Sequence, residues 1–466
     1  MGALAAATVL ACATRAWNLT RFPLWTDEIF TWNAARAGVW HALTLVDQTP
    51  PLFATVLAGW MQVAGDGLLA ARIPALLFGA ATVPLVQLIG RRFLSERGAV
   101  LAAVLSALSV TLVILSQEAR AYAPYAFFAA ASWLALLRLE ERWSVGRAAA
   151  YAALTAGMLY SHVFALFVAL AQTVYFLARR TVALRQWTAA QAGAALLFAP
   201  WLPVFWAGLQ RVVGSFWIRR PDQADLYWTR RGLSGGGPWL PWLVPAVLVV
   251  GAVYAGKARR LGRLWAPVLW LGVAVGVPLA TSVWKPIFWP NYVLPVAVPV
   301  TLLVVWTLER LPGKAGVAAA AVVLVVAAAS LGQYFAGGQG EDEKQDWHGA
   351  FATLDGAAAR NATVVWNTGI CDAAGGHGAC PYPLYGSRSD LRHVSFFTED
   401  RGVEPVVDAV NVHGLGAAVG NASEVWVLYT YDRDPGRLIL SELAALGYHA
   451  DGDWWFKRVE LHRFER

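Results

Sequence analysis

Eleven apolar runs that read as membrane-spanning helices limit what this chain of 466 residues can fold into. A hydrocarbon layer about 30 Å thick is crossed by roughly 17–25 predominantly apolar residues in helical conformation. Hydrophobic residues make up 58% of the chain and charged residues only 14%, whereas soluble domains carry about 25% charged residues. This composition excludes a soluble dehydrogenase, kinase or DNA-binding protein. The runs lie near residues 2–17, 71–90, 98–115, 121–137, 148–161, 163–178, 187–206, 238–256, 264–283, 291–308 and 315–335.

Charge is unevenly distributed along the chain. Residues 336–466 contain 19 acidic and 11 basic side chains, whereas residues 1–335 contain 11 acidic and 26 basic ones. The basic residues of the longer part lie between apolar runs, so the net charge of +7 does not indicate a nucleic-acid partner. We predict a transmembrane domain over residues 1–335 and a small soluble domain over residues 336–466.

The soluble part has the sequence pattern of a small α/β domain. Short β-rich runs bounded by turn residues indicate strands, and one amphipathic run indicates a helix. The expected elements are strands at Thr363–Trp366 and Glu424–Tyr429, a helix at Leu438–Leu446, and one or two closing strands within Trp454–Phe464.

Two of the three cysteines, Cys371 and Cys380, lie nine residues apart in a glycine-rich loop of this domain. In an oxidising compartment they would form a disulfide. A zinc site that includes His377 is the weaker alternative. Cys12 lies in the first apolar run and is expected to serve packing.

Basic residues alternate between the two sides of the predicted transmembrane domain. One set of loops holds 15 Lys and Arg in 36 positions, at residues 91–97, 138–147, 179–185, 257–263 and 310–314. The opposite set holds 9 in 100 positions, at residues 18–70, 116–121, 161–163, 207–237 and 284–290. Because loops rich in Lys and Arg remain in the cytoplasm, the first set faces the cytoplasm. The N-terminus is then inside and the acidic tail outside.

The run Pro50–Gly65 does not fit as a twelfth span. It is short, begins with two prolines and is followed by Asp66. If it crossed the membrane, the later loops would change sides, and their Lys and Arg content would no longer be consistent with that of the first loop. We predict that it lies along the outer interface or re-enters the membrane from that side.

The acidic residues of the transmembrane domain are concentrated on one side. Four of the eleven lie in cytoplasmic loops, and the other seven fall on the outer side. Carboxylates beside apolar helices are costly to hold and tend to line functional cavities. The distribution therefore predicts an active site at the outer surface. The seven are Asp27, Glu28, Asp47, Asp66, Glu118, Asp222 and Asp225.

The first outer loop contains the strongest candidate carboxylates. Thr26 is placed to cap a short helix whose first turn contains Asp27 and Glu28. Both acids favour the positive end of such a helix, which is the structural explanation for their presence. The flanking Trp25 and Trp32 would desolvate the pair, and this favours a functional role, above all for Asp27.

A second cluster, Ser116–Tyr122, lies where the third spanning helix ends and the fourth begins. Glu118 and Arg120 are two positions apart, so they do not share a helix face. In a tight outer turn they can reach different partners. An interfacial salt bridge, worth about 0–1 kcal/mol, is the alternative explanation.

Basic groups on the outer side suit a phosphate. Arg72, Arg120 and Lys285 lie at the depth where a membrane enzyme would meet a lipid phosphate, and guanidinium binds phosphate oxygens in a bidentate manner. Attraction to lipid headgroups is the alternative for each of them. His162, between two helices, is expected at the outer surface, either as an ordinary interfacial histidine or as part of the site.

Together these stretches resemble the GT-C glycosyltransferases that use polyprenyl-phosphate sugars, the branch with protein O-mannosyltransferases and lipid A aminoarabinose transferases. The resemblance covers roughly residues 10–310 and, more loosely, the tail at residues 336–466. At Asn291-Tyr292 the chain departs from the Arg-Tyr that is common in that family. The matching stretches are Leu24–Glu28, Asp47–Leu52, Ala71–Ala75, Ser116–Tyr122 and Lys285–Phe288.

The resemblance implies a polytopic α-helical membrane protein of the GT-C fold, with about eleven transmembrane helices and juxtamembrane helices in the first external loop. It implies a sugar transferred with inversion to a hydroxyl on the extracytoplasmic side of the cytoplasmic membrane. Asp27, with Glu28, would be catalytic, and Arg72, Arg120 and Lys285 would bind the donor phosphate. The residues expected to line the site are Asp47, Glu118, Tyr122, His162 and Tyr292.

The chemistry sets the expected partners. An inverting transfer needs a base on the acceptor hydroxyl, and positioned proton transfer contributes about 10²–10⁴-fold. A phosphate leaves without a general acid when cations stabilise its charge, so no cofactor is required, although Asp27, Glu28 and Glu118 could hold a divalent cation. The partners are a polyprenyl-phosphate-linked sugar donor, a hydroxyl-bearing acceptor and the lipid bilayer.

Two other functions compete with this interpretation. A transporter or flippase for a lipid-linked or polar solute would also place charges at helix ends. Inverted repeats and broken helices near mid-membrane would indicate it. A scaffold whose outer domain binds other proteins is the second alternative, and it would not depend on the first-loop carboxylates.

Overall fold

The computed structural model divides the chain into two compact units. The first comprises Met1–Leu19, Val39–Leu209 and Ile218–Gln339, and the second comprises Thr20–Gly38, Gln210–Trp217 and Gly340–Arg466. The second unit therefore contains Thr20–Gly38 of the first outer loop as well as the C-terminal part. The structure describes residues 2–44, 49–180, 182–213, 218–257, 262–337, 345–367, 380–394, 411–430, 434 and 437–466.

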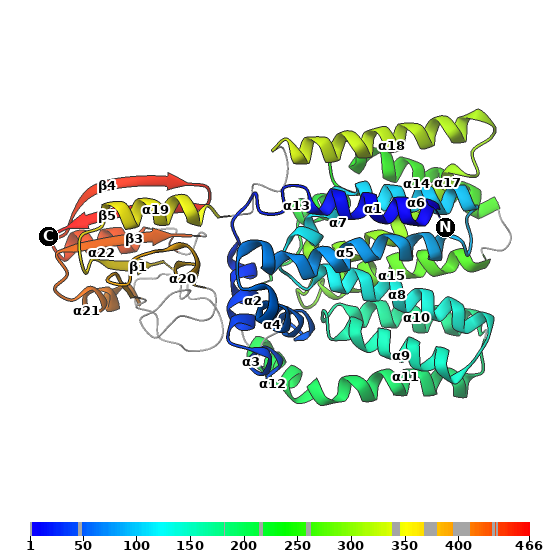
Figure 1. Ribbon diagram of the computed structural model, residues 1–466, viewed down its shortest axis with the longest axis horizontal. Coiled ribbons are helices and arrows are strands. Elements are labelled where there is room, and N and C mark those ends of the chain that lie inside the picture. Colours follow the sequence, from blue (N-terminus) through cyan, green and yellow to red (C-terminus); the bar gives the residue numbers. More distant parts are fainter. Residues whose placement is uncertain are drawn as a thin grey trace. The chain divides into compact units, whose positions relative to one another are not determined.

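The first unit is built of helices packed side by side (Figure 1). Each of the eleven predicted apolar runs is helical, and three of them are interrupted once or twice by a bend or a 3-10 turn. The helices are α1 Gly2–Ala16, α3 Val39–Thr44, α4 Leu52–Ala64, α5 Leu68–Gly90, α6 Glu96–Leu108, α7 Val110–Gln117, α8 Tyr122–Glu141, α9 Val145–Leu159, α10 Ala165–Arg179, α11 Leu184–Phe198, η1 Ala199–Trp201, α12 Leu202–Val213, α13 Gln223–Leu233, α14 Leu240–Lys257, η2 Gly262–Leu264, α15 Trp265–Thr281, α16 Pro290–Val293, η3 Leu294–Val296, α17 Ala297–Leu308 and α18 Lys314–Phe335.

Four of the described helical segments are long and apolar enough to cross a membrane, and the bent pair α6–α7 makes up to five. Six other predicted spans are helices of 15 to 20 residues. They pack within the same unit, as expected of an integral multi-pass membrane protein. The four long segments are Leu68–Gly90, Leu184–Gln210, Pro290–Leu308 and Lys314–Phe335.

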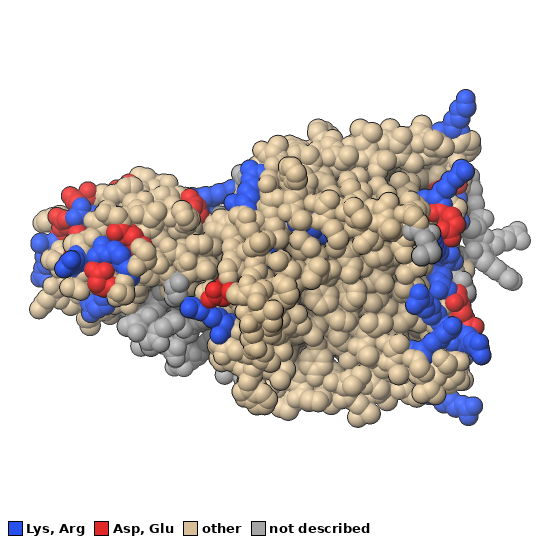
Figure 2. All heavy atoms as spheres, viewed as in Figure 1, with Lys and Arg blue, Asp and Glu red and all other residues tan. Residues whose placement is uncertain are grey.

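The basic loops gather at one end of the helical unit. Lys and Arg cluster where α5 meets α6, α8 meets α9 and α17 meets α18, and the flank between the two ends is almost devoid of charge (Figure 2). The start of α5 lies close to the end of α1, as the hydrogen bond from Arg72 Nη1 to the Leu19 carbonyl at 2.8 Å shows. The chain between them therefore begins and ends on one side. The 13 residues of α4 span about 20 Å.

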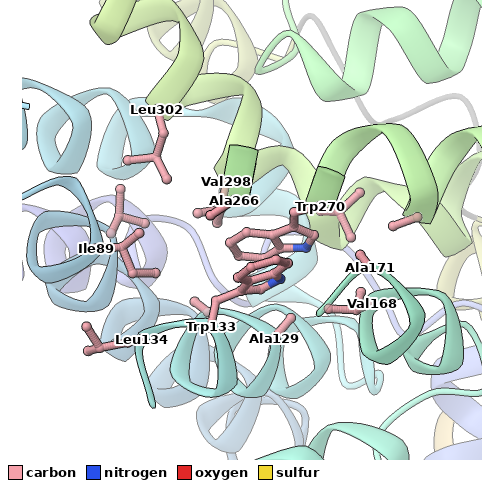
Figure 3. Packing of buried hydrophobic residues seen from close by; sticks show 14 of the residues in the cluster. Ile89, Ala129, Trp133, Leu134, Val168, Ala171, Ala266, Trp270, Val298 and Leu302 are labelled. Atoms are coloured by element: carbon pink, nitrogen blue, oxygen red, sulfur yellow. The ribbon is translucent and has the colours of Figure 1, made fainter. Parts of the chain in front are cut away.

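Aromatic side chains fill the centre of this unit. Trp133 of α8 and Trp270 of α15 stack with centroids 5.6 Å apart, and Ile89, Val168 and Leu302 surround them (Figure 3). Both indoles are at most 1% exposed. Offset aromatic pairs contribute about 0.5–1.5 kcal/mol beyond the area that they bury. This packing joins helices from both halves of the unit.

A bend of 54° separates α6 from α7 at Ser109. The Thr111 amide does not continue the helix but donates to the Gly235 carbonyl at 3.4 Å. The side chain of Arg15 is fully buried beside the last turn of α6. It donates hydrogen bonds to the carbonyls of Ser106 and Ala107, both at 3.2 Å. The bend is thus held by a guanidinium that satisfies backbone groups which the helix itself leaves without donors.

The second unit contains a five-stranded mixed sheet in the order β2-β1-β3-β5-β4. Strand β1 is parallel to β2 and β3, and β5 is antiparallel to β3 and β4, with a bulge at Ala450/Gly452. The predicted strands and the predicted helix are present, and the closing region is a hairpin. The elements are α2 Thr26–Arg36, α19 Trp347–Ala357, β1 Thr363–Trp366, α20 Tyr382–Tyr385, β2 Arg392–Val394, η4 Asn411–Gly414, α21 Leu415–Val419, β3 Glu424–Tyr429, α22 Leu438–Ala445, β4 His449–Phe456 and β5 Val459–Glu465.

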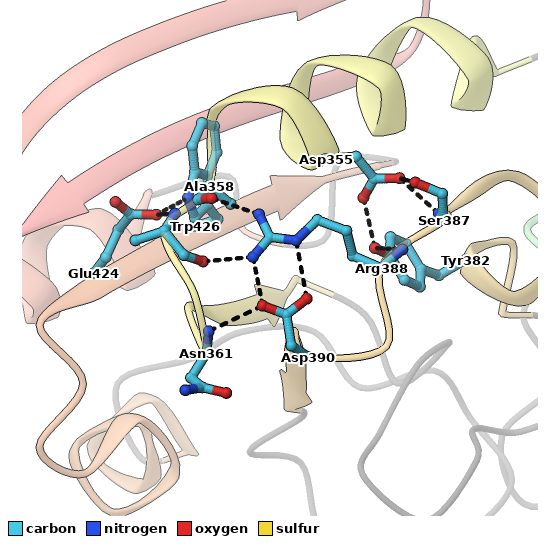
Figure 4. A network of polar contacts seen from close by, with 10 residues as sticks. Asp355, Ala358, Asn361, Tyr382, Ser387, Arg388, Asp390, Glu424 and Trp426 are labelled. Carbon is cyan, nitrogen blue, oxygen red and sulfur yellow. Dashed lines mark hydrogen bonds and ion pairs between the residues drawn. The ribbon is translucent and has the colours of Figure 1, made fainter.

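A polar network fastens the segment that follows α20 to the rest of this unit (Figure 4). Arg388 binds Asp390 and donates to the Ala359 carbonyl at 2.9 Å. Asp355 accepts the Tyr382 hydroxyl at 2.6 Å and the Ser387 hydroxyl at 2.7 Å. The bond to Arg388 holds the pKa of Asp390 well below its ordinary value. The network fixes the path of the chain between α20 and β2.

His393 makes this unit sensitive to acid. Its Nδ1 accepts the Trp366 Nε1–H at 3.1 Å, and burial lowers its pKa from 6.5 to about 4. At pH values between about 4 and 6.5, His393 binds a proton in the unfolded chain but not in the folded one. The free energy of unfolding therefore falls as the pH falls. Lowering the pH from 7 to 5 should cost the domain about 2 kcal/mol through His393. Hydrogen exchange of β1 and β2 in the full-length protein should accelerate accordingly, whereas a His393→Gln variant, which cannot titrate, should lose this pH dependence.

Candidate active site

Helix α2 carries the two carboxylates that the sequence singled out. Its N-cap is Trp25, so the prediction that Thr26 caps the helix is wrong by one residue, because Trp25 retains the extended backbone and Thr26 is already helical. Asp27 and Glu28 lie in the first turn, as predicted. Glu28 is fully buried, and its Oε2 accepts the Trp25 amide at 3.3 Å. Glu28 thus closes the start of the helix, which favours Asp27, half-buried beside it, as the reacting group.

Helix α2 is bound at both ends to one short segment of the C-terminal domain. The Leu24 amide, just before the helix, donates to the Tyr385 hydroxyl at 2.5 Å. Asn33 Nδ2, near the end of the helix, donates to the Cys380 carbonyl at 3.5 Å. Cys380 is disulfide-bonded and Cys12 is free, whereas Cys371, the predicted partner of Cys380, lies outside the described residues. These contacts explain why the loop belongs to the second unit.

A cluster of aromatic rings beside Arg120 lies in the first unit, at the end opposite the basic loops. The guanidinium of Arg120 is 6.0 Å from the centroid of the Tyr122 ring. His162 lies between Tyr122 and Tyr292, with centroid distances of 5.8 and 4.9 Å. Glu118 is 8% exposed, and its carbonyl accepts the Arg120 amide at 2.7 Å, which forms the tight turn expected there. The structure thus brings four of the predicted site residues together and places Glu118 in the same turn.

His162 is neutral near pH 7. Its Nδ1 accepts the Phe164 amide at 3.1 Å, so the proton resides on Nε2. Burial, and secondly the charge of Arg120, lowers the pKa of His162 to about 3. A histidine with this pKa does not take up a proton during catalysis at neutral pH. His162 can therefore donate a hydrogen bond or shape the site, but it does not compete with a carboxylate as the base.

The other predicted cations lie on separate elements. Arg72, in the first turns of α5, is 1% exposed, and its Nη1 donates to the Leu19 carbonyl at 2.8 Å. Lys285 is exposed in the loop after α15. That loop is held by Ser282, whose hydroxyl accepts the amides of Ile287 and Phe288 at 3.0 and 2.8 Å. Asp47 lies outside the described residues.

Two outer acids have structural roles. Asp222 Oδ1 accepts the Asp225 amide and Asp225 Oδ2 accepts the Asp222 amide, both at 3.0 Å, which is a reciprocal cap at the start of α13. Arg219 pairs with both carboxylates, at 2.8 and 3.1 Å. Asp66 is exposed in a turn. Among the outer acids that the structure describes, Asp27, Glu28 and Glu118 remain candidates for chemistry. In the described ranges no three His, Cys, Asp or Glu side chains are arranged to hold a metal ion.

Sequence reasoning missed two residues that position these elements. Arg15 is a basic residue inside the first apolar run, and such a residue signals a special role by itself. Tyr385 carries no such signal, because a tyrosine in a loop-rich tail is ordinary. Gln117, within the second cluster, donates to the carbonyls of Arg15 and Trp17 and accepts the Tyr334 hydroxyl at 2.7 Å, so it joins three helix ends.

Residues 48–206 match the sequence pattern of the family described as dolichyl-phosphate-mannose-protein mannosyltransferase. This segment contains Arg72, Glu118, Arg120, Tyr122 and His162. No curated protein matches the chain.

Solved structures share the fold along nearly the whole chain. ArnT from Cupriavidus metallidurans in the apo state is 14% identical with a TM-score of 0.63, and the match covers 99% of this chain and 97% of that one. The same protein bound to undecaprenyl phosphate matches over the same shares, with 14% identity and a TM-score of 0.55. The archaeal oligosaccharyltransferase AglB from Archaeoglobus fulgidus, in complex with an inhibitory peptide and a dolichol-phosphate, is 12% identical with a TM-score of 0.52, and the match covers 77% of this chain and 58% of that one. The predicted resemblance is confirmed.

Proposed function

We propose that this chain, a glycosyltransferase of the GT-C type whose residues 48–206 carry the mannosyltransferase family pattern, transfers a sugar from a polyprenyl phosphate to a hydroxyl acceptor. The observation that carries the proposal is the likeness to ArnT over 99% of the chain, since that protein has also been solved with undecaprenyl phosphate. The acceptor is a glycan, a lipid or a protein with a hydroxyl group.

In the proposed mechanism Asp27 removes the proton from the acceptor hydroxyl as it attacks the anomeric carbon. The bond from that carbon to the phosphate oxygen breaks on the opposite side, so the anomeric configuration inverts. The position of Asp27 supports this role, because its side chain is half-buried at the positive end of α2. Glu28 stabilises that end of the helix by accepting the Trp25 amide. No general acid is required, because the leaving group departs as a phosphate.

Cations on the first unit stabilise the charge that develops on the phosphate. Arg120 and Arg72 are assigned to the phosphate oxygens, with Lys285 contributing a mobile charge from its exposed loop. Tyr122, His162 and Tyr292 form a ring-lined wall beside Arg120. Glu118 is proposed to orient Arg120 from within the same turn. Asp47 completes the set that the family resemblance assigns to the site.

The proposed topology has eleven spans, with the basic loops and the N-terminus in the cytoplasm. The clustering of basic loops at one end of the helical unit supports it (Figure 2). Arg120, His162 and Lys285 then lie at the extracytoplasmic end, and the C-terminal domain lies outside the membrane. The donor would therefore be a lipid-linked sugar, since nucleotide sugars are made in the cytoplasm.

A transfer assay tests the proposal. The purified full-length protein in proteoliposomes should release polyprenyl phosphate from a panel of polyprenyl-phosphate sugars in the presence of a hydroxyl acceptor. It should not use nucleotide sugars. If the protein instead moved the lipid-linked sugar across the bilayer without consuming it, the flippase alternative would replace the proposal. Among the helices that the structure describes, the bent span α6–α7 favours that alternative.

A further inference from the structure

We propose that the segment Cys380–Tyr385 of the C-terminal domain is the positioning element for α2, the helix that carries Asp27. Tyr385 and the disulfide-bonded Cys380 are its functional residues. The inference rests on the proposed role of Asp27. It assigns a task to a domain whose function neither the sequence pattern nor the fold likeness specifies.

The first contact fixes the entry to the helix. Leu24 is fully buried, and its amide donates to the Tyr385 hydroxyl, which belongs to α20. A buried amide that loses its acceptor is left with the full cost of its desolvation. The next amide, that of Trp25, is bound by Glu28. The backbone just before Asp27 is therefore held by one bond from the C-terminal domain and one from within α2.

The second contact fixes the direction of the helix. Asn33 binds the Cys380 carbonyl, and Leu24 binds Tyr385. Nine residues separate the two points on the loop, or about 13 Å along a helix axis. Both acceptors lie within six residues of each other in the C-terminal domain. Two separated attachments to one segment restrict both rotation and tilt of α2, which a single contact does not.

The segment that provides these acceptors is itself rigid. A disulfide at Cys380 closes one end. The Tyr382 hydroxyl binds Asp355 of α19 at 2.6 Å, and the Tyr382 ring packs edge-on against Phe351 with centroids 5.0 Å apart. The Gly386 amide donates to the Tyr382 carbonyl at 2.7 Å. A path of bonded and packed groups thus leads from the core of the domain to the helix that carries Asp27.

The expected effect on catalysis follows from how strongly the rate of proton transfer depends on the position of the base. A displacement of about 1 Å can reduce the rate by about 100-fold. Loss of one of the two attachments should allow a smaller displacement. Removing the Tyr385 hydroxyl should therefore lower kcat by about 10-fold and leave KM for the donor within about 2-fold, because donor contacts lie on other elements.

The test compares Tyr385→Phe with Tyr448→Phe in the full-length protein. Tyr448 also donates its hydroxyl to a backbone carbonyl, that of Ala422 at 2.7 Å, within the same domain. Hydrogen exchange of residues 20–38 is measured beside kcat and KM. We expect Tyr385→Phe to accelerate exchange there by at least 10-fold and to lower kcat, with neither effect in Tyr448→Phe. Reduction of the disulfide with dithiothreitol in a Cys12→Ser background should also accelerate exchange in residues 20–38.

The outcomes separate this inference from the proposed function. If exchange in residues 20–38 is the same in both tyrosine variants, the positioning inference is refuted, whatever the activity. If exchange accelerates but kcat is unchanged, the attachment exists but does not serve catalysis, and the inference is again refuted. If wild-type protein transfers no sugar, the proposed function fails, and the exchange result still reports on the attachment.

Discussion

Replacement of Asp27 by asparagine should lower kcat for sugar transfer by about 10²–10⁴-fold, the usual contribution of a positioned general base. Asparagine keeps the size of the side chain and its place in the first turn of α2 but cannot accept the proton of the acceptor hydroxyl. KM for the polyprenyl-phosphate donor should change little, because the proposed donor contacts are cationic. Initial rates in proteoliposomes over a range of donor concentrations measure both quantities.

The matched control for this variant is Asp66→Asn. Asp66 is an exposed carboxylate in an outer turn, so the same charge is removed from a position outside the proposed site. Its transfer rate should equal that of the wild type. A second comparison, Glu28→Gln, separates the two acids, since Glu28 accepts the Trp25 amide and its loss should weaken α2. Full activity of Asp27→Asn would remove this residue from the mechanism.

Replacement of Arg15 by leucine should destabilise the first unit by about 2–5 kcal/mol, which is among the largest effects expected of any single substitution here. The variant removes the guanidinium that donates to the buried carbonyls of Ser106 and Ala107, of which the Ala107 carbonyl keeps the Thr14 hydroxyl at 3.0 Å. Water is absent from the hydrocarbon layer and cannot replace it. Thermal unfolding in detergent and the yield of folded protein should both fall sharply.

Arg185→Leu is the control for this experiment. Arg185 is exposed on α11, so its replacement should change stability by no more than about 0.5 kcal/mol. Arg15→Lys should be intermediate, because an ammonium supplies fewer directed donors than a guanidinium. Equal stability of Arg15→Leu and Arg185→Leu would show that the bend between α6 and α7 does not depend on Arg15.

The helices of the first unit could be predicted because their signal is local. Runs such as 71–90 and 315–335 contain almost no charge, and the corresponding helices α5 and α18 begin and end within three residues of those limits. The same holds for the strands Thr363–Trp366 and Glu424–Tyr429, which are buried along their whole length. In each case the residues that determine the element are the residues within it.

The parts that could not be predicted depend on residues far apart in the sequence. The bend at Ser109, whose hydroxyl caps α7 by accepting the Leu112 amide at 3.4 Å, also involves Arg15 in another helix and Gly235 in a distant loop. The attachment of the first loop to the C-terminal domain is of the same kind. Among the candidate site residues, the grouping of Tyr122, His162 and Tyr292 brings together the start of α8, the loop after α9 and helix α16. No single stretch of the sequence encodes that arrangement.

The bond between Leu24 and Tyr385 has a consequence for how the protein is made. The two residues are 361 positions apart. At about 5–20 residues per second, the ribosome adds the second about 20–70 s after the first. During that interval the loop with Asp27 has left the ribosome without its final partner. In each newly made molecule α2 therefore gains this attachment only near the end of synthesis, and a chain truncated before Tyr385 would carry every membrane helix without it.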